Sequence, residues 1–356
     1  MSDSPITPEN LIVTSVVEQV TRDAESRSST PTYQWLEERA TEYLKALGQD
    51  PSIHMRTVLH LLAKKLNPPR FDPASVLTTK ITRSNLINEE DLKNINYYWP
   101  RLQRRITNKI GKEAAKKVDE DTNRIMVQLP HPTRGDSFLC KGLVVGDVQA
   151  GKTNNYTALI NKASDLGYKL VIVLSGVTKN LRVQTQRRLD ADYIGRQSVA
   201  ERNKESHQRI GVGLDPTTDN LKVPTSITDQ STDFVFKNGL VVESQNNPVL
   251  IVTIKNKSIL ENIRDWIKGQ VDPSTQKFTS PVLIIDDESD NASVNTSDPD
   301  ENPKTINRLI REIISYCQRA SYVAYTATPF ANIFIDPDDI DDAFGEELFP
   351  RDFIIG

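Results

Sequence analysis

Residues 146–153 of this chain have the sequence GDVQAGKT, which matches the phosphate-binding pattern G-x-x-x-x-G-K-[ST] at every fixed position. A short apolar run at 142–145 comes directly before this stretch, and a helical pattern at 155–166 follows it. The pattern requires a strand, a loop and a helix in this order. We therefore expect a nucleotide-binding loop within an α/β fold.

Each fixed residue of the loop has a chemical reason. Gly146 and Gly151 allow the backbone to wrap so that its N–H groups face phosphate oxygens, and the following helix directs its positive end to the same place. Lys152 would reach the β- and γ-phosphates, and the Thr153 hydroxyl would bind Mg²⁺. We expect ATP and Mg²⁺ as cofactors. The predicted nucleotide-binding residues are Gly146, Asp147, Val148, Gln149, Ala150, Gly151, Lys152, Thr153 and Asn154.

Short apolar runs and helical patterns alternate through the second part of the chain. This alternation is typical of a parallel sheet with helices on both faces. The runs lie at 142–145, 170–174, 249–253, 282–285 and 322–325, and the helical patterns at 155–166, 180–189, 258–268 and 305–319. The predicted fold class is α/β, a RecA-like P-loop NTPase lobe over 131–356 with a polar insertion at about 190–247.

The first part of the chain, 1–130, indicates an all-helical region. Apolar residues recur at helical spacing at 36–47 and 58–66, and Asn88 is a candidate N-cap for a third helical stretch. That stretch carries the aromatic residues Tyr97, Tyr98 and Trp99, and a fourth helix is predicted at 113–129. Packing against the next domain is the favoured role for these aromatics, and base stacking is the alternative.

Composition narrows the possible classes of protein. The chain has 356 residues, of which 37% are hydrophobic and 26% charged, and its net charge of −4 excludes a globally basic nucleic-acid binder but not a local basic groove. Cys140 and Cys317 are too few for a disulfide framework or a four-cysteine zinc site, so we expect buried free thiols. The sequence shows neither a membrane span nor a signal peptide, so we expect a cytoplasmic protein with no membrane partner.

An acidic stretch follows the apolar run at 282–285. It reads Asp286-Asp287-Glu288-Ser289-Asp290, and carboxylates at the end of such a strand lie near the phosphate loop. One register assigns Asp287 to the metal and Glu288 as the general base; the other assigns Asp286 and Asp287. We favour the first because D-E-x-D resembles a helicase box, and we keep Asp286 as a further metal ligand. The predicted catalytic residues are Glu288, Lys152 and Asp287.

Two further groups of polar residues follow strands. Thr326, Ala327 and Thr328 resemble the T-A-T-P coupling element of superfamily-two helicases, although a simple turn before Pro329 is the alternative. Hydroxyl, amide and basic side chains after the runs at 170–174 and 249–253 suit contacts with a phosphodiester backbone, and helix caps and solvated lysines are the alternative. The candidates for nucleic-acid contacts are Thr178, Lys179, Asn180, Arg182 and Lys255.

Four stretches together resemble the Z-one domain family. They are GDVQAGKTNNYTALINKASDLGYKLVIVLSG at 146–176, NLRVQTQRRLD at 180–190, LIIDDESDNASVNT at 283–296 and YTATPFANIF at 325–334. The resemblance covers about 90–356. It implies a superfamily-two helicase-like ATPase that acts on DNA with a nuclease domain or subunit, sometimes beside a MutL/MORC-type ATPase, in bacterial restriction or antiviral defence. The residues carried over are Gly146, Gly151, Lys152, Thr153, Asp287, Glu288, Thr326 and Thr328.

Members of that family continue beyond the length of this chain. The last residues, RDFIIG at 351–356, indicate a strand, so we expect a truncated chain that lacks the second motor lobe and its arginine finger. Such a fragment would turn ATP over slowly, if at all. The preferred function is a DNA-dependent ATPase or translocase, and the alternative is a nucleotide-gated scaffold that does not translocate. No lysine follows the acids at 283–293, so no nuclease motif is recognised there.

Overall fold

In this computed structural model the chain forms two units, which are described separately. One comprises 1–75 with 328–334 and 356, and the other comprises 76–327 with 335–355. The structure describes residues 8–26, 33–50, 54, 57–58, 61–62, 76–77, 85–135, 137–146, 149–198, 208–236, 239–290, 303–327, 340–341, 345–346, 348 and 350–356.

The described residues of the N-terminal unit include the helices α1 (Pro8–Glu25) and α2 (Tyr33–Ala46). Apolar side chains at helical spacing face each other between them, and the Tyr43 hydroxyl donates to Asp23 Oδ2 at 2.7 Å. The predicted helix at 36–47 is confirmed by α2, whereas most of the one predicted at 58–66 falls outside the described residues. The buried cluster of this unit comprises Val13, Val16, Val17, Val20, Leu36, Ala40, Leu44, Val58 and Leu62.

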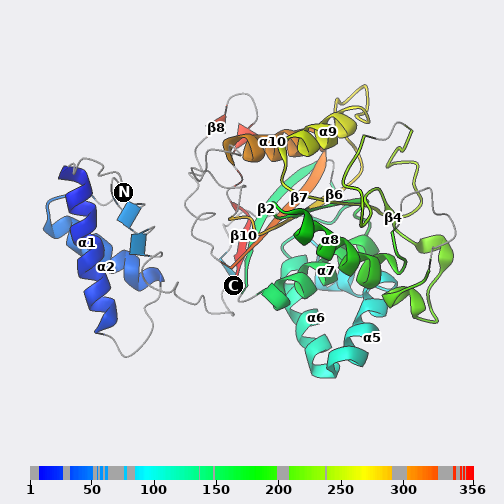
Figure 1. Ribbon diagram of the computed structural model, residues 1–356, viewed down its shortest axis with the longest axis horizontal. Helices are drawn as coiled ribbons and strands as arrows, with labels where there is room; N and C mark the ends of the chain where they lie inside the picture. The colour runs from blue at the N-terminus through cyan, green and yellow to red at the C-terminus, as the bar shows by residue number, and fades with distance from the viewer. Residues whose placement is uncertain are drawn as a thin grey trace. The chain divides into compact units, whose positions relative to one another are not determined.

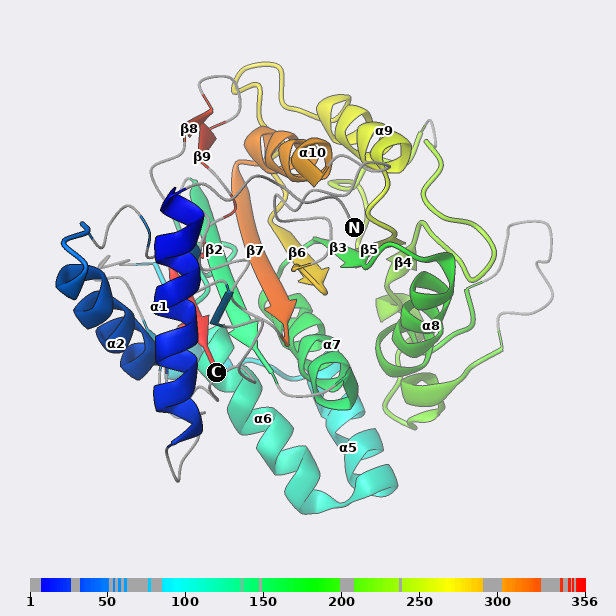
Figure 2. The same cartoon turned by 60° about the vertical axis from the view of Figure 1, so that its left-hand side comes forward.

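The second unit is built on an eight-stranded sheet with the order β1-β10-β2-β7-β6-β3-β5-β4 (Figures 1 and 2). Within this sheet, every adjacent pair of described strands is parallel except β1 and β10. The strands are β1 (Val76–Leu77), β2 (Phe138–Val145), β3 (Leu170–Ser175), β4 (Thr225–Ser226), β5 (Val249–Thr253), β6 (Val282–Asp287), β7 (Arg319–Thr326) and β10 (Phe353–Ile355). A separate antiparallel pair joins β8 (Ile340–Asp341) and β9 (Gly345–Glu346).

Helices cover both faces of this sheet, as Figure 1 shows. One face carries α7 and α8, with α5 and α6 packed outside α7, and the other carries the pair α9 and α10. Strands covered in this way are buried throughout, and β3 and β5 are apolar at nearly every position. The helices are α4 (Glu89–Leu92), α5 (Tyr98–Ile110), α6 (Lys112–Met126), α7 (Gln149–Leu166), α8 (Lys179–Leu189), α9 (Lys257–Lys268) and α10 (Pro303–Tyr316).

All five predicted apolar runs are strands of the sheet, and the predicted α/β class is confirmed. The terminal RDFIIG stretch provides β10, parallel to β2, as its pattern predicts. The helix predicted at 305–319 is wrong at its end, because α10 stops at Tyr316 and Arg319 already begins β7. The polar stretch predicted as an insertion at 190–247 adds short 3-10 and π-helical turns, and β4 extends the edge of the sheet beside β5.

Helices α5 and α6 belong to the sheet unit, so the predicted boundary near residue 130 does not separate them from it. Asp165 of α7 accepts hydrogen bonds from the backbone N–H groups of Tyr97, Tyr98 and Trp99 at 2.9–3.0 Å, which satisfies the first turn of α5. Tyr98 and Trp99 are buried there, so the predicted packing role of these aromatics is confirmed. Within the described residues, no helix is both long and apolar enough to cross a bilayer.

Candidate functional site

The carboxyl ends of four neighbouring strands bring the predicted site residues to one edge of the sheet. Val145 at the end of β2 is paired with Thr326 at the end of β7, and Asp287 at the end of β6 is paired with Tyr325 and with Ser175 of β3. Parallel strands place their carboxyl ends on the same side, which is where α/β proteins bind ligands. The loop after β2 and the acidic turn after β6 therefore lie together.

Residues 146–153 begin directly after β2 and end within the first turns of α7. The Gly146 N–H donates to the Thr326 carbonyl at 3.1 Å, and a Cβ atom added at Gly146 would lie 3.1 Å from Cγ of Lys152. The lysine side chain thus folds back over this glycine and is only 8% exposed. By contrast, a Cβ atom on Gly151 would meet nothing within 4 Å.

Several predicted loop residues cannot be placed. Asp147 and Val148 lie outside the described residues, as do the side chains of Gln149 and Ala150. Thr153 and Asn154 lie in the first turns of α7 and are partly exposed.

Asp287 faces the α7 side of the sheet, where Lys152 approaches it. Burial raises the pKa of Asp287 above its ordinary value, and the charge of Glu288 raises it further. The ammonium groups of Lys152 and Lys255 act in the opposite direction and lower this pKa. Burial is thus the main reason that the charged form of the Asp287 carboxyl is disfavoured in the protein without a ligand.

Tyr156 is a site residue that the sequence reasoning missed. It is fully buried, and its hydroxyl lies near Asp287 and Thr153 without a hydrogen bond of normal geometry to any described residue. Burial, and secondarily the Asp287 charge, raise the pKa of this phenol. Its ring packs edge-on against Tyr325 with centroids 5.6 Å apart. The spacing of three residues from Thr153 could have identified it, because such residues are neighbours on a helix.

Glu288 occupies an unusual backbone conformation. Its φ angle is +53°, in the left-handed region that non-glycine residues rarely adopt and that often marks a functional site. Its carboxylate lies against the loop after β3, since a Cβ atom added at Gly176 would be 3.1 Å from Glu288 Oε2. Gly176 itself has a φ of +78°. The absence of a side chain at Gly176 leaves room for the carboxylate of the predicted base.

Asp286 lies on the opposite face of the sheet from Asp287. Its carboxylate is fully buried, forms an ion pair with Lys255 at 2.7 Å and accepts a hydrogen bond from the Tyr322 hydroxyl at 2.5 Å. The prediction that Asp286 is a metal ligand is therefore not supported by its position. Successive side chains of a strand point to opposite faces, so only one of the two aspartates can face the loop after β2.

The predicted coupling element contacts the acidic turn directly. The Thr326 hydroxyl donates to Asp290 Oδ1 at 2.8 Å, and the Ser289 N–H donates to the Tyr325 carbonyl at 3.0 Å. Ala327 follows as an exposed residue, while Thr328 lies outside the described residues. The end of β7 is thus hydrogen-bonded on one side to the loop after β2 and on the other to the acidic turn.

Two of the predicted nucleic-acid contacts need correction. Arg182 is 3% exposed and donates to the carbonyls of Asp229 and Gln230, so it holds the 229–232 loop in place. Lys255 is fully buried in its ion pair. Neither cation can reach a phosphodiester backbone, because each already neutralises or satisfies groups inside the protein.

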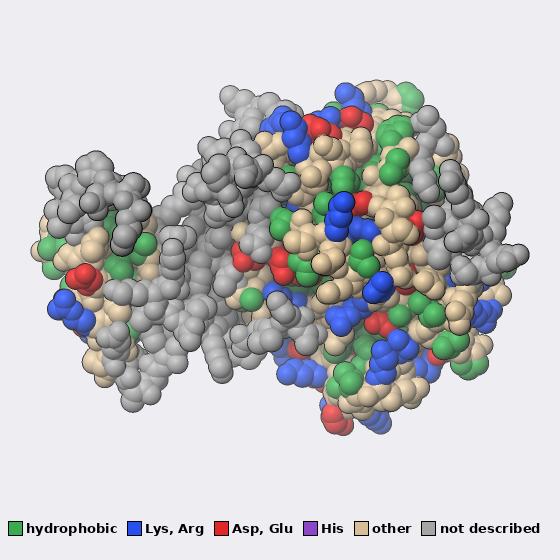
Figure 3. Space-filling view, viewed as in Figure 1, with side chains coloured by type: hydrophobic (Ala, Val, Ile, Leu, Met, Phe, Trp, Pro, Cys, Tyr) green, Lys and Arg blue, Asp and Glu red, His purple; other side chains and the backbone are tan. Residues whose placement is uncertain are grey.

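The other three candidates surround the start of α8. Thr178 is the N-cap and accepts a hydrogen bond from the Leu181 N–H at 3.3 Å, and Lys179 and Asn180 are exposed. Figure 3 shows Lys and Arg side chains scattered over the face that carries α8 and α5, with acidic side chains between them. The described residues on this face form no continuous basic stripe.

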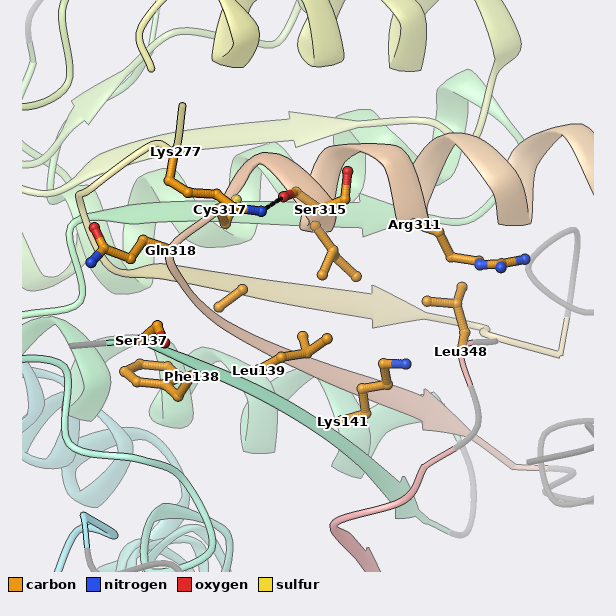
Figure 4. A pocket seen from close by; sticks show the side chains of 12 residues that line it. Ser137, Phe138, Leu139, Lys141, Lys277, Arg311, Ser315, Cys317, Gln318 and Leu348 are labelled. Carbon is orange, nitrogen blue, oxygen red and sulfur yellow. Dashed lines mark hydrogen bonds between the residues drawn. The ribbon is translucent and has the colours of Figure 1, made fainter. Parts of the chain in front are cut away.

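A cavity of about 460 Å³ lies elsewhere, between α10 and the first residues of β2 and β7 (Figure 4). Lys277 closes one end, where its ammonium donates to the Ser315 carbonyl. The strands begin here and end at the opposite edge, so this cavity is separate from the site at the carboxyl ends. Its lining includes Phe138, Leu139, Lys141, Arg311, Cys317 and Leu348.

Among the described residues, no three His, Cys, Asp or Glu side chains form a metal centre. Mg²⁺ commonly binds through one or two carboxylates together with substrate phosphates and water, and Thr153 with Asp287 fits this type of site. No protein-family model matches the chain, and a comparison with curated proteins finds no match.

Proposed function

We propose that the sheet unit is a P-loop, RecA-like ATPase lobe of the superfamily-two helicase type, acting on DNA together with a nuclease in a bacterial restriction or antiviral defence system. The observation that carries the proposal is the approach of Lys152 to Asp287 at the carboxyl edge of the sheet. One strand, β7, separates the strand before the phosphate loop from the strand before the acidic turn. The nuclease partner and the defence context rest on the resemblance to the Z-one domain family.

Each residue has a chemical task in this proposal. The backbone N–H groups after Gly146 and the start of α7 would hold the phosphates, and Lys152 would neutralise the β- and γ-phosphates. Thr153 and Asp287 would hold Mg²⁺, whose charge would stabilise the transferring phosphoryl group. Glu288 would take a proton from the attacking water as general base.

Thr326 would communicate between the nucleotide and the acidic turn. Its carbonyl accepts from the Gly146 N–H, and its hydroxyl donates to Asp290. If the loop after β2 moves when ATP binds, Thr326 would transmit this movement to the acidic turn through its two hydrogen bonds. This arrangement supports the coupling role that its resemblance to a helicase element suggests.

A nucleotide-gated scaffold is the second candidate, and one observation favours it. Arg182 and Lys255 are buried, which removes two of the five predicted contacts with nucleic acid. A switch would use the same loop and acidic turn to bind and hydrolyse ATP, but it would need no path for a DNA strand.

ATP turnover by the intact protein separates the two candidates. We expect single- or double-stranded DNA to stimulate turnover if the protein is a motor, and a rate that does not respond to either DNA would support the scaffold. Lys152→Ala is the control, because the proposed role of its ammonium is to bind the phosphates, so we expect this variant to lose nucleotide binding while it keeps its fold. Unchanged nucleotide affinity of this variant in calorimetry would contradict the proposed ATP site.

A further inference from the structure

We propose that Lys255 is a positioning residue that holds the turn of the predicted base, Glu288, from the neighbouring loop after β5. The catalytic part of this inference rests on the proposed function, in which Glu288 is the general base. Lys255 Nζ lies 2.7 Å from Asp286 Oδ1 and donates to the Glu288 carbonyl, also at 2.7 Å. One ammonium therefore contacts both Asp286, the last but one residue of β6, and Glu288 in the turn that follows.

The contact crosses an intervening strand. Lys255 follows β5, while Asp286 and Glu288 belong to β6 and its turn, and β3 lies between these two strands. The backbone at Lys255 is fixed to the loop after β3, because the Lys255 N–H donates to the Gly176 carbonyl at 2.9 Å. Gly176 is also the residue that the Glu288 carboxylate lies against. The lysine thus completes a bridge from the β5 loop, over the end of β3, to the acidic turn.

The backbone of the turn needs such a support. Glu288 has a φ of +53°, a conformation that costs a non-glycine residue free energy and persists only when surrounding contacts impose it. A hydrogen bond from a buried ammonium to the carbonyl of this residue is such a contact, and charge-assisted hydrogen bonds are stronger than neutral ones. Lys255 and Asp286 are both fully buried, so water does not compete with either side chain for its partner.

A buried ion pair also has a purely structural explanation, and the experiment must separate the two. Removing Lys255 alone would leave the Asp286 carboxylate buried and uncompensated, which would destabilise the fold. The double variant Lys255→Met with Asp286→Asn removes both charges and keeps an acceptor for the Tyr322 hydroxyl. It still lacks the hydrogen bond to the Glu288 carbonyl. Lys257→Met is the matched control, because Lys257 is an exposed lysine only two positions away, at the first residue of α9.

Three measurements on the intact protein test the proposal: nucleotide affinity, DNA-free ATP turnover and hydrogen exchange of the Glu288 and Ser289 amides. We expect the double variant to bind nucleotide as the wild type does and to turn it over about 100-fold more slowly, as for a misplaced catalytic group. Adding Glu288→Gln should lower turnover no further. Exchange of the two turn amides should increase, and Lys257→Met should change none of these quantities.

Wild-type turnover in the double variant, or unchanged exchange of the turn amides, would overturn the positioning role. If the wild-type protein does not hydrolyse ATP at all, the proposed function fails. The exchange experiment is performed without nucleotide, so it still decides whether Lys255 holds the turn.

Discussion

The two neighbouring aspartates of the acidic turn show how residues one position apart acquire different roles. Asp287 faces α7 and Lys152, whereas Asp286 faces the α9–α10 side and is neutralised by Lys255. The sequence predicted an acidic site at this strand end but left two registers open. Alternation along a strand is visible in the sequence, but which face carries the phosphate loop depends on packing. The burial of Lys255 could not be predicted either, because its partner Asp286 is distant in the sequence.

The raised pKa of Asp287 leads to a prediction for stability. Since burial disfavours its charged form, the ionised carboxylate destabilises the ligand-free fold above the raised pKa and has no such cost below the ordinary value of 3.8. Asp287→Asn should therefore raise the Tm at neutral pH without Mg²⁺, and this gain should shrink as the pH is lowered toward 3.8.

The same substitution should reduce Mg²⁺-dependent turnover by more than about 100-fold, because a catalytic metal contributes several kcal/mol. Thermal unfolding across pH and ATPase assays with Mg²⁺ measure the two effects. A lower Tm at neutral pH would show that Asp287 stabilises the ligand-free protein instead.

At the scale of helices and strands, local sequence patterns predicted much of the fold. The five central strands were recognisable as β-branched, apolar runs separated by helical periodicity. The short edge strands β1 and β4 were not, because two residues carry no period and depend on their neighbours for pairing. The sequence suggests a surface cation at Arg182, but the side chain is buried against backbone carbonyls. One of these, that of Asp229, lies 47 positions further along the chain, and no local pattern reveals such a partner.

Gly142 gives a prediction about the pairing of β2 with β10. It lies directly opposite Phe353, and a Cβ atom there would lie 2.0–2.4 Å from atoms of the Phe353 ring. Gly142→Ala should overpack this site and destabilise the fold by about 1–3 kcal/mol. Gly151→Ala, whose Cβ meets nothing within 4 Å and which lies in α7, should not lower the Tm, because alanine is the better helix former. Thermal unfolding of both variants is the measurement, and an unaltered Tm for Gly142→Ala would mean that β10 moves freely away from β2.

At the scale of the whole chain, the helices that precede the central strands belong to two different units: α1 and α2 to one, and α4 to α6 to the other. Composition and periodicity predicted one helical region over 1–130, because helices of different units look alike in sequence. In the structure, α5 and α6 are bound to α7 through the Asp165 cap and through Lys162, whose buried ammonium donates to Asp119 and Thr122 of α6. Helices α1 and α2 instead share their own apolar cluster. Such long-range contacts decide where a unit begins.

A chain that begins at Val76 should therefore fold without the N-terminal unit. It keeps β1 and α4 to α6, so we expect its Tm to differ from that of the intact protein by less than about 4 °C, or about 1 kcal/mol, with an unchanged affinity for nucleotide. A chain that begins at Lys112 is the contrasting variant, because it loses α5 with the buried Tyr98, Trp99 and Leu102. This shorter chain should unfold at a clearly lower temperature. Equal losses in the two truncated chains would mean that the first 75 residues are part of the same cooperative unit as the sheet.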